Sequence, residues 1–168
     1  MQIRQVPVSE PGAAVSFDSL PVCQLNVFPD PPGHDLPFAQ ARIYAEQGRS
    51  LFLKLSAYEA DAPADSRFLA SFGTLALEVS PNGSRLTLDG KPLENAAVRV
   101  TPMRGDDLQG EFWGAVVQLP LSVLRLALPS LTLLPGGSIP FALTKSSDLT
   151  GYRAALFDGE GSLALSAF

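Results

Sequence analysis

The sequence predicts an all-β protein, a sandwich of two antiparallel sheets with jelly-roll or immunoglobulin-like topology and one or two short connecting helices. Three observations favour this fold class. Apolar and polar residues alternate in several short windows, a strong turn signal separates two of these windows, and helical periodicity is almost absent. The 168 residues are 46% hydrophobic and 17% charged, which suffices for one core, so we expect residues 1–168 to form one domain.

The clearest predicted hairpin lies in the middle of the chain. Apolar residues take alternate positions in 74–80 and again in 85–89, as in strands with one buried face. The intervening Pro81-Asn82-Gly83 fits a tight turn, because Asn and Gly tolerate the positive φ that such turns require.

Other strands follow from the same alternation, and about nine to eleven are expected in total. They are 3–8, 41–46, 51–58, 98–103, 111–119, 139–145, 152–157 and 162–168. Hairpin turns are expected at 47–49 and 105–107. Two helices are predicted as connectors, one capped by Asp65 or Ser66 and running to Phe72, and one over 121–128 after Pro120. The proline-rich segment 29–37 must be irregular.

The composition excludes several classes of partner. Lys and Arg total 12 against 17 Asp and Glu, a formal net charge of −5. Such a chain has no basic face for nucleic acid or for an anionic membrane surface. The longest Leu-rich stretch, 115–134, is interrupted by Gln, Arg and Pro and is too broken to span a bilayer.

The N-terminus and the cysteine count indicate a compartment. The opening residues MQIRQVPVSEPG hold no apolar segment after a basic start, so we predict no signal peptide and a cytoplasmic protein. Cys23 is the single cysteine, which excludes an internal disulfide and fits a reducing environment. One Cys and one His cannot form a zinc site, and we assign neither metal ligands nor a cofactor.

Catalysis by a Ser-His-acid triad would require His34, the only imidazole, which lies beside Asp35 in the proline-rich segment. Neither a G-x-S-x-G turn nor a phosphate-binding glycine loop occurs. An isolated loop histidine is more often solvated than catalytic, so we assign no catalytic residue.

Paired carboxylates leave an enzymatic alternative open, because a glycoside hydrolase needs only two acids at a suitable separation. The visible clusters are Asp106-Asp107, expected at a hairpin tip, and Glu59, Asp61 and Asp65, expected in a polar loop. The second cluster could also supply oxygen ligands to calcium, although it lacks the spacing of a calcium loop. Solvated turn residues are the simpler interpretation of both clusters.

A sugar ligand calls for aromatic surfaces with polar groups beside them. Trp113 is the sole tryptophan and lies in a run whose two faces are both apolar, so a core position is its simpler interpretation. Two groupings near strand ends combine aromatic and charged residues. They are Tyr58 with Glu59 and Asp61, and Lys145 with Tyr152 and Arg153.

Several motifs occur in an order that resembles a known family. The strands 41–46 and 51–58 lead into Tyr58-Glu59-Ala60-Asp61-Ala62-Pro63, the strand 75–79 leads into Ser80-Pro81-Asn82-Gly83, and 112–119 leads into Pro120-Leu121-Ser122-Val123-Leu124. This order is similar to that of the carbohydrate-binding family 9-like domains, sandwich modules related to the sugar-binding ends of some xylanases and to DOMON-type domains. The resemblance covers residues 38–168 and implies a sandwich that binds carbohydrate.

We therefore expect a non-catalytic module that binds a carbohydrate or another small ligand. Its predicted site residues are Tyr58, Glu59, Asp61, Trp113, Lys145, Tyr152 and Arg153. The family's platform of paired tryptophans cannot be built from one Trp. A structural or protein–protein interaction domain without glycan binding is thus an alternative, and such a domain could form a homodimer through an apolar sheet face.

Overall fold

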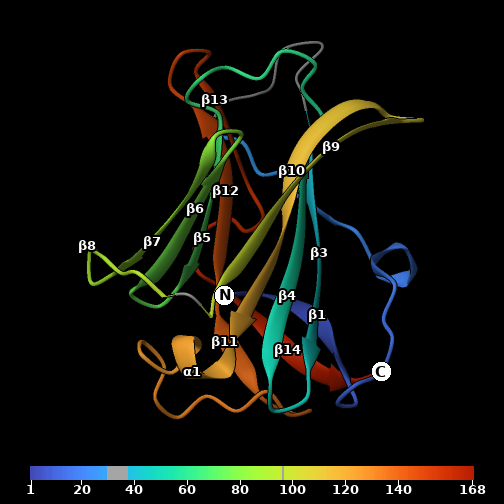
Figure 1. The fold of residues 1–168 in the computed structure, drawn as a ribbon, viewed down its shortest axis with the longest axis vertical. Helices are drawn as coiled ribbons and strands as arrows, with labels where there is room; N and C mark the ends of the chain where they lie inside the picture. The colour runs from blue at the N-terminus through green and yellow to red at the C-terminus, as the bar shows by residue number, and fades with distance from the viewer. Residues whose placement is uncertain (30–37, 96) are drawn as a thin grey trace.

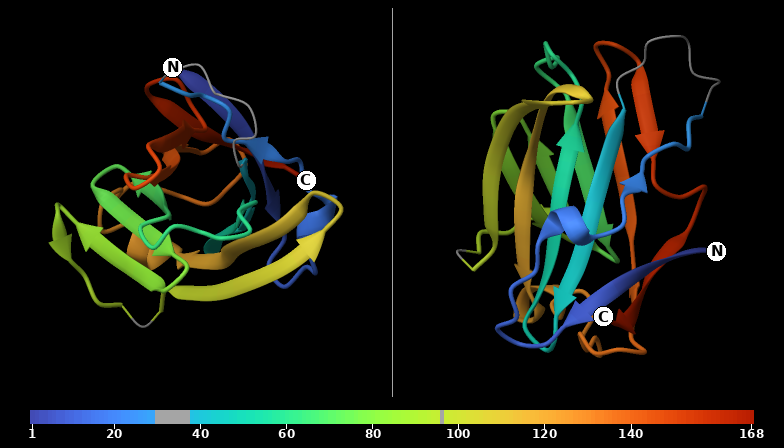
Figure 2. Two further views of the ribbon diagram at one scale, coloured as in Figure 1. Left: turned by 90° about the horizontal axis from the view of Figure 1, so that it is seen from above. Right: turned by 90° about the vertical axis from the view of Figure 1, so that its right-hand side faces the viewer.

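Two β-sheets pack face to face in the computed structural model, which describes residues 1–29, 38–95 and 97–168 (Figure 1). Most of this part of the chain is strand, and most of the paired strands are antiparallel. The view from above in Figure 2 shows the strands arranged around a shared interior. The predicted all-β sandwich is therefore confirmed.

The larger sheet has eight strands within the described residues. Its order is β11 (Ser138–Pro140), β14 (Gly161–Ala167), β1 (Gln2–Ser9), β3 (Ala39–Glu46), β4 (Ser50–Ala57), β10 (Gly110–Pro120) and β9 (Arg99–Asp107), and β2 (Cys23–Gln24) pairs with β3. β1 runs parallel to both β14 and β3. The first and last strands of the chain therefore lie side by side inside this sheet.

The smaller sheet has six strands in the same part of the chain. Its order is β13 (Tyr152–Ala155), β12 (Ala142–Ser147), β5 (Arg67–Phe72), β6 (Leu75–Ser80), β7 (Gly83–Leu88) and β8 (Lys91–Pro92). The predicted central hairpin is confirmed, with Ser80 paired to Gly83 across a two-residue turn. The strand predicted over 139–145 is two strands, because the chain passes from the larger sheet to the smaller one at Phe141.

The helix predicted to run to Phe72 is wrong, since these residues form strand β5. Phe68, Ala70 and Phe72 are buried while Leu69 is 40% exposed, which is the period of two typical of a strand. The two phenylalanines stand four residues apart, and that spacing fits either period. Pairing with β6 and β12 on both sides decides in favour of the strand.

The two helices that the structure does contain in its described residues are short. They are the 3-10 turn η1 (Phe17–Ser19) and α1 (Leu121–Leu124). α1 follows Pro120 as predicted but stops before 128, because the chain tightens so that the Leu126 N–H donates to the Val123 carbonyl. Within the described ranges, neither helix has the length and apolar character needed to cross a membrane.

β9 and β10 extend past the sandwich as a twisted ribbon (Figure 1). The turn predicted at 105–107 is wrong, since these residues belong to β9 and the chain turns at Leu108 and Gln109. Leu108 is fully exposed, so nothing at the tip imposes an alternation of apolar and polar residues. Alternation of apolar and polar residues identifies a strand only where one of its faces is buried. The sequence therefore predicted that β9 ends at 103, whereas the strand continues to Asp107.

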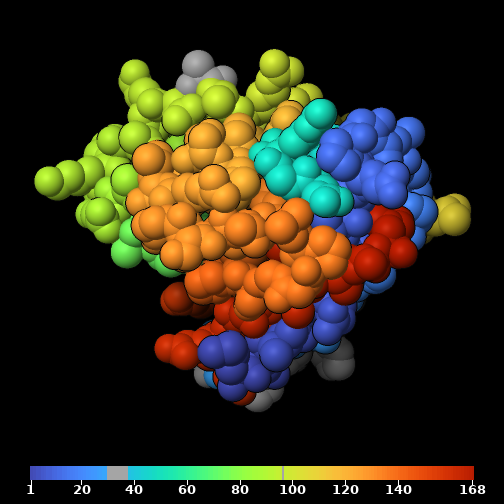
Figure 3. Space-filling view, turned by 90° about the horizontal axis from the view of Figure 1, so that it is seen from below, coloured from blue at the N-terminus to red at the C-terminus, as the bar shows by residue number. Residues whose placement is uncertain are grey.

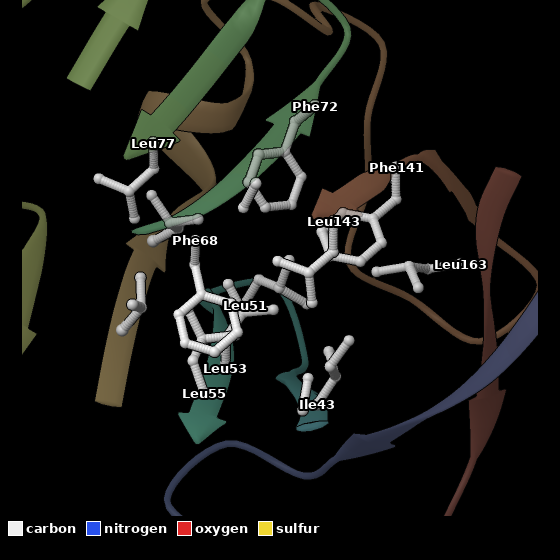
Figure 4. Packing of buried hydrophobic residues seen from close by; sticks show 14 of the residues in the cluster. Ile43, Leu51, Leu53, Leu55, Phe68, Phe72, Leu77, Phe141, Leu143 and Leu163 are labelled. Atoms are coloured by element: carbon white, nitrogen blue, oxygen red, sulfur yellow. The ribbon is translucent and has the colours of Figure 1, made fainter. Parts of the chain in front are cut away.

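Side chains from both sheets fill the interior (Figure 4). Phe68 and Phe72 from β5 are fully buried, and Leu51, Leu53 and Leu55 from β4 lie in the same cluster. Burying a side chain of this size contributes about 1.5–3 kcal/mol. This core fixes the two sheets relative to each other and so positions the side chains at the ends of their strands.

The lower end of the sandwich is covered by α1 and the chain that follows it, residues 121–137, which are orange in Figure 3. Arg125 Nε donates to the Leu131 carbonyl over 2.9 Å, and Leu124 and Leu133 are fully buried. The opposite end carries the segment 58–66 and the β9–β10 turn. The candidate site lies at that upper end.

Gly114 marks a close approach of two strands. A Cβ built at this position would overlap the Leu55 carbonyl oxygen and would lie 3.0 Å from Met103 Cε. We expect Gly114→Ala to lower the free energy of unfolding by about 1–3 kcal/mol, because β10 must move away from β4. Thr101→Ala, at an exposed position on the adjacent strand β9, should change it by less than about 0.5 kcal/mol. Equal effects in urea unfolding would contradict this account.

Candidate functional site

Four of the seven predicted site residues meet at the upper end of the sandwich. Glu59 follows β4, Trp113 lies in β10, Lys145 in β12 and Tyr152 in β13. We call these four, together with Ser66, the buried charge cluster. β4 and β10 are antiparallel partners, so the residue that follows β4 lies near the start of β10. β12 and β13 bring the other two residues from the smaller sheet.

Three donors in the cluster converge on one oxygen of Glu59. Ser66 Oγ donates to Glu59 Oε1 over 2.7 Å, and Trp113 Nε1 donates to the same atom over 2.9 Å. Lys145 Nζ lies 2.7 Å from it as an ion pair. Among the described residues, Glu59 Oε2 has no hydrogen-bond donor. The carboxylate is thus fixed through one oxygen, and the other is free to bind.

The Glu59–Lys145 pair is deeply buried, with side chains 7% and 1% exposed. Burial raises the pKa of Glu59, but the Lys145 ammonium and the donors Ser66 and Trp113 outweigh it and hold this pKa below its usual value. Burial lowers the pKa of Lys145, and attraction to Glu59 opposes that effect. The cluster therefore favours the charged form of the Glu59 carboxylate.

Tyr152 forms one wall of the cluster. Lys145 Nζ stands 4.7 Å from the centre of its ring, a cation–π contact, and Phe28 meets the ring edge-on. The hydroxyl is buried, and no group of the described residues bonds to it. Burial, with repulsion from Glu59, raises the pKa of Tyr152 to about 12.

This burial predicts how the protein responds to alkali. The pKa of Tyr152 is about 12 in the folded protein against an ordinary value of 10.0, so stability should fall as the pH rises from about 10 towards 12. We expect tyrosinate absorbance to appear together with the loss of circular dichroism. Tyr152→Phe should retain the fold and lose the part of this alkaline sensitivity that Tyr152 contributes, while Tyr58, whose pKa is also raised to about 12, keeps its own part. Ionisation of all the tyrosines near pH 10 in a fully folded protein would contradict the prediction.

A hollow of about 390 Å³ opens beside the cluster, and we call it the end hollow. It is lined by Glu59, Ala60, Ala62, Arg104, Gly105, Asp106, Glu111, Phe112 and Trp113. Most of these lining residues belong to the β9–β10 ribbon, where residues two apart in a strand share a face. Arg104 is paired with Trp113 and Asp106 with Glu111, which places all four side chains on the inner face of the ribbon.

Charge on the ribbon side of the end hollow is unbalanced. Asp106 and Glu111 are direct cross-strand partners with the same charge, an arrangement that destabilises a sheet. Among the described residues that line the hollow, Arg104 is the one cation. Within the ranges that the structure describes, no ion pair includes any of these three exposed residues. They are free to bind a polar ligand.

Three predicted site residues lie elsewhere. Tyr58 is next to Glu59 in the chain but points to the outer face, where its ring packs between Phe38 and Phe112. Its hydroxyl donates to Asp107 Oδ2 over 2.8 Å, and burial together with this bond raises its pKa to about 12. Asp61 is exposed in the loop after β4. Arg153 is exposed on β13 and faces away from the buried charge cluster.

The carboxylate clusters singled out in the sequence are divided in space. Asp106 lines the end hollow while Asp107 binds Tyr58 on the other face of the ribbon. Asp65 accepts from Ser147 Oγ over 2.6 Å and from the N–H groups of Asp148 and Leu149, which lowers its pKa.

Across residues 1–29, 38–95 and 97–168, no three acidic, His or Cys side chains gather as metal ligands would. His34 and Asp35 lie outside the described residues.

Sequence reasoning missed Arg104 and Glu111, and it treated Asp106 as a turn residue. The signal that could have identified them is their spacing relative to Trp113. Had the two strands been extended to Asp107 and Gly110, the period of two would have placed all three residues on the face of that tryptophan.

Comparisons with known proteins bear on the fold. No family model matches the chain, and no curated protein matches it. Among solved structures, the chain is similar to a Bacteroides uniformis protein described as a candidate carbohydrate-binding protein. The two superpose with a TM-score of 0.68 and share 16% sequence identity, over 98% of this chain and 99% of the other. At this identity the likeness establishes a common fold over nearly the whole chain.

Proposed function

We propose that the protein binds a carbohydrate or a similar small polyol in the end hollow without catalysing a reaction. The observation that carries this proposal is the geometry of Glu59. Its Oε1 takes all three internal donors, and its Oε2 has none among the described residues although the side chain lines the end hollow. A carboxylate oxygen held in this way is a ready acceptor for a sugar hydroxyl.

The hollow also offers donors and an apolar surface. Arg104 can donate to ring or hydroxyl oxygens, and Asp106 and Glu111 can accept from hydroxyls at the rim. Ala60 and Ala62 add apolar surface to the same lining. Trp113 is only 2% exposed, so it shapes the hollow and fixes Glu59 rather than serving as a stacking platform. Polar contacts, each worth about 1.5–3 kcal/mol when one partner is charged, carry the proposed binding.

Hydrolysis is the less favoured function for this hollow. A glycosidase that works near neutral pH needs a carboxylic acid with a raised pKa to protonate the leaving group. The carboxylate at the base of the hollow, Glu59, has a lowered pKa because of Lys145, Ser66 and Trp113. Such a group accepts hydrogen bonds and does not hold a proton to donate.

Titration with mono- and oligosaccharides tests the proposal. Trp113 is the sole tryptophan, so its indole N–H gives a single NMR signal that reports on the Glu59 contact. We expect a binding sugar to shift this signal. Arg104→Ala should weaken binding about 10–100-fold, whereas Arg153→Ala, away from the hollow, should leave it unchanged. Failure of every sugar to bind, or binding without an indole shift, would refute the proposal.

A further inference from the structure

Resting on the proposed function, we infer that the end hollow selects a sugar carrying a free ammonium group, that is, an amino sugar, over neutral and acidic sugars. Three features support this specificity. They are the like-charged pair on the ribbon, the charge balance of the lining, and the free oxygen at its base.

The like-charged pair is the first feature. Asp106 and Glu111 are direct cross-strand partners, so their side chains project from the same face of the ribbon at neighbouring positions. Two carboxylates at such positions repel each other unless a cation lies between them. The described residues place no cation within ion-pair distance of either one. A ligand ammonium seated at this rim removes the repulsion and gains two charge-assisted hydrogen bonds.

The charge balance points the same way. Lys145 is 1% exposed and bound to Oε1 of Glu59, so it neutralises Glu59 without reaching the hollow. Of the described residues in the lining, Asp106 and Glu111 then carry two negative charges and Arg104 one positive charge, which leaves one net negative charge at the rim. This charge favours a cation and repels the carboxylate of an acidic sugar.

The number of free acceptors, Glu59 Oε2 among them, suits an amino sugar better than a bare metal ion. A divalent cation needs about six oxygen ligands, and the described residues hold no group of three or more suitable side chains. A sugar ammonium needs only two or three acceptors, which the rim pair supplies, while a hydroxyl of the same ring reaches Oε2. The hollow of about 390 Å³ has room for one such ring.

The test compares glucosamine oligosaccharides with their N-acetylated and neutral counterparts by calorimetry at about pH 6, where the amine is protonated. Glucuronate and calcium chloride are included as further ligands. We expect the amino sugar to bind at least 10-fold more tightly than the neutral sugar. The double variant Asp106→Asn/Glu111→Gln should abolish this preference, so that the amino sugar and the neutral sugar bind equally well. The control Asp107→Asn removes a charge from the other face of the same ribbon and should keep the preference.

The possible outcomes distinguish failure of the amino-sugar specificity from failure of the proposed function. Binding of neutral sugars with no gain from the amine would overturn the specificity and leave the proposed function intact. Calcium binding without a preference for the amino sugar would likewise overturn the specificity and leave the proposed function intact. Failure of all the sugars to bind would remove the proposed function and this inference together. Loss of the preference with Asp107→Asn would show that bulk charge, not the rim pair, is responsible.

Discussion

Replacing Lys145 with methionine will lower the free energy of unfolding by about 3–5 kcal/mol, because the change leaves the Glu59 carboxylate buried and unpaired. Glu59→Gln will have an effect of similar size, since it strands the ammonium instead. The double variant Glu59→Gln/Lys145→Met should recover most of the loss, because no buried charge then remains. Urea unfolding of the four proteins measures the coupling.

The acid side of the stability curve gives an independent check. The pKa of Glu59 is held below its ordinary value of 4.5, so its contribution is present above that pH and is lost as the pH falls through the lower folded value. Glu59→Gln should therefore flatten the acid limb of the curve. Additive losses in the double variant, or an unchanged acid limb, would show that the pair does not act as a coupled unit.

Truncating Phe68 to alanine will have the other large effect, a loss of about 3–5 kcal/mol. Phe68 is fully buried between the sheets, and its ring lies 5.5 Å from that of Trp113. Its cross-strand partner is Lys145, so the resulting cavity would open beside the buried charge cluster. We expect the Trp113 indole signal to shift or broaden as well.

Leu69→Ala is the matched control for this change. Leu69 follows Phe68 on β5 but points outward and is 40% exposed. Its truncation should cost less than about 1 kcal/mol and leave the indole signal in place. A comparable loss from both substitutions would mean that β5 does not present one face to the core and the other to solvent.

The fold could be predicted wherever one sheet face is buried and the other solvated. The alternation in 74–80 and 85–89 identified β6 and β7, and their short turn set the register. Alternation did not identify β5, because the four-residue spacing of Phe68 and Phe72 suits a helix and a strand equally well. It also ended strand β9 too early, at Met103, because the residues from Arg104 to Asp107 have no buried face. These errors arise because pairing partners, not local preference, decide the structure there.

The candidate site was predictable by residue type but not by geometry. Glu59, Trp113, Lys145 and Tyr152 stood out because they are polar or aromatic residues near strand ends. Their convergence depends on contacts across 54 residues between Glu59 and Trp113, which no local pattern encodes. Asp61 and Arg153 share the same sequence character, yet both point to solvent.

The pairing of β1 with β14 has a consequence for the order of folding. β1 enters the larger sheet between β3 and the last strand of the chain, so one of its edges stays open until Gly161–Ala167 has been synthesised. Its neighbours at that edge are among the most distant in the sequence, and closing so long a loop is slow. We therefore expect the closure of this edge to be a late step in folding, during which the nascent chain is most exposed to mispairing with other strands.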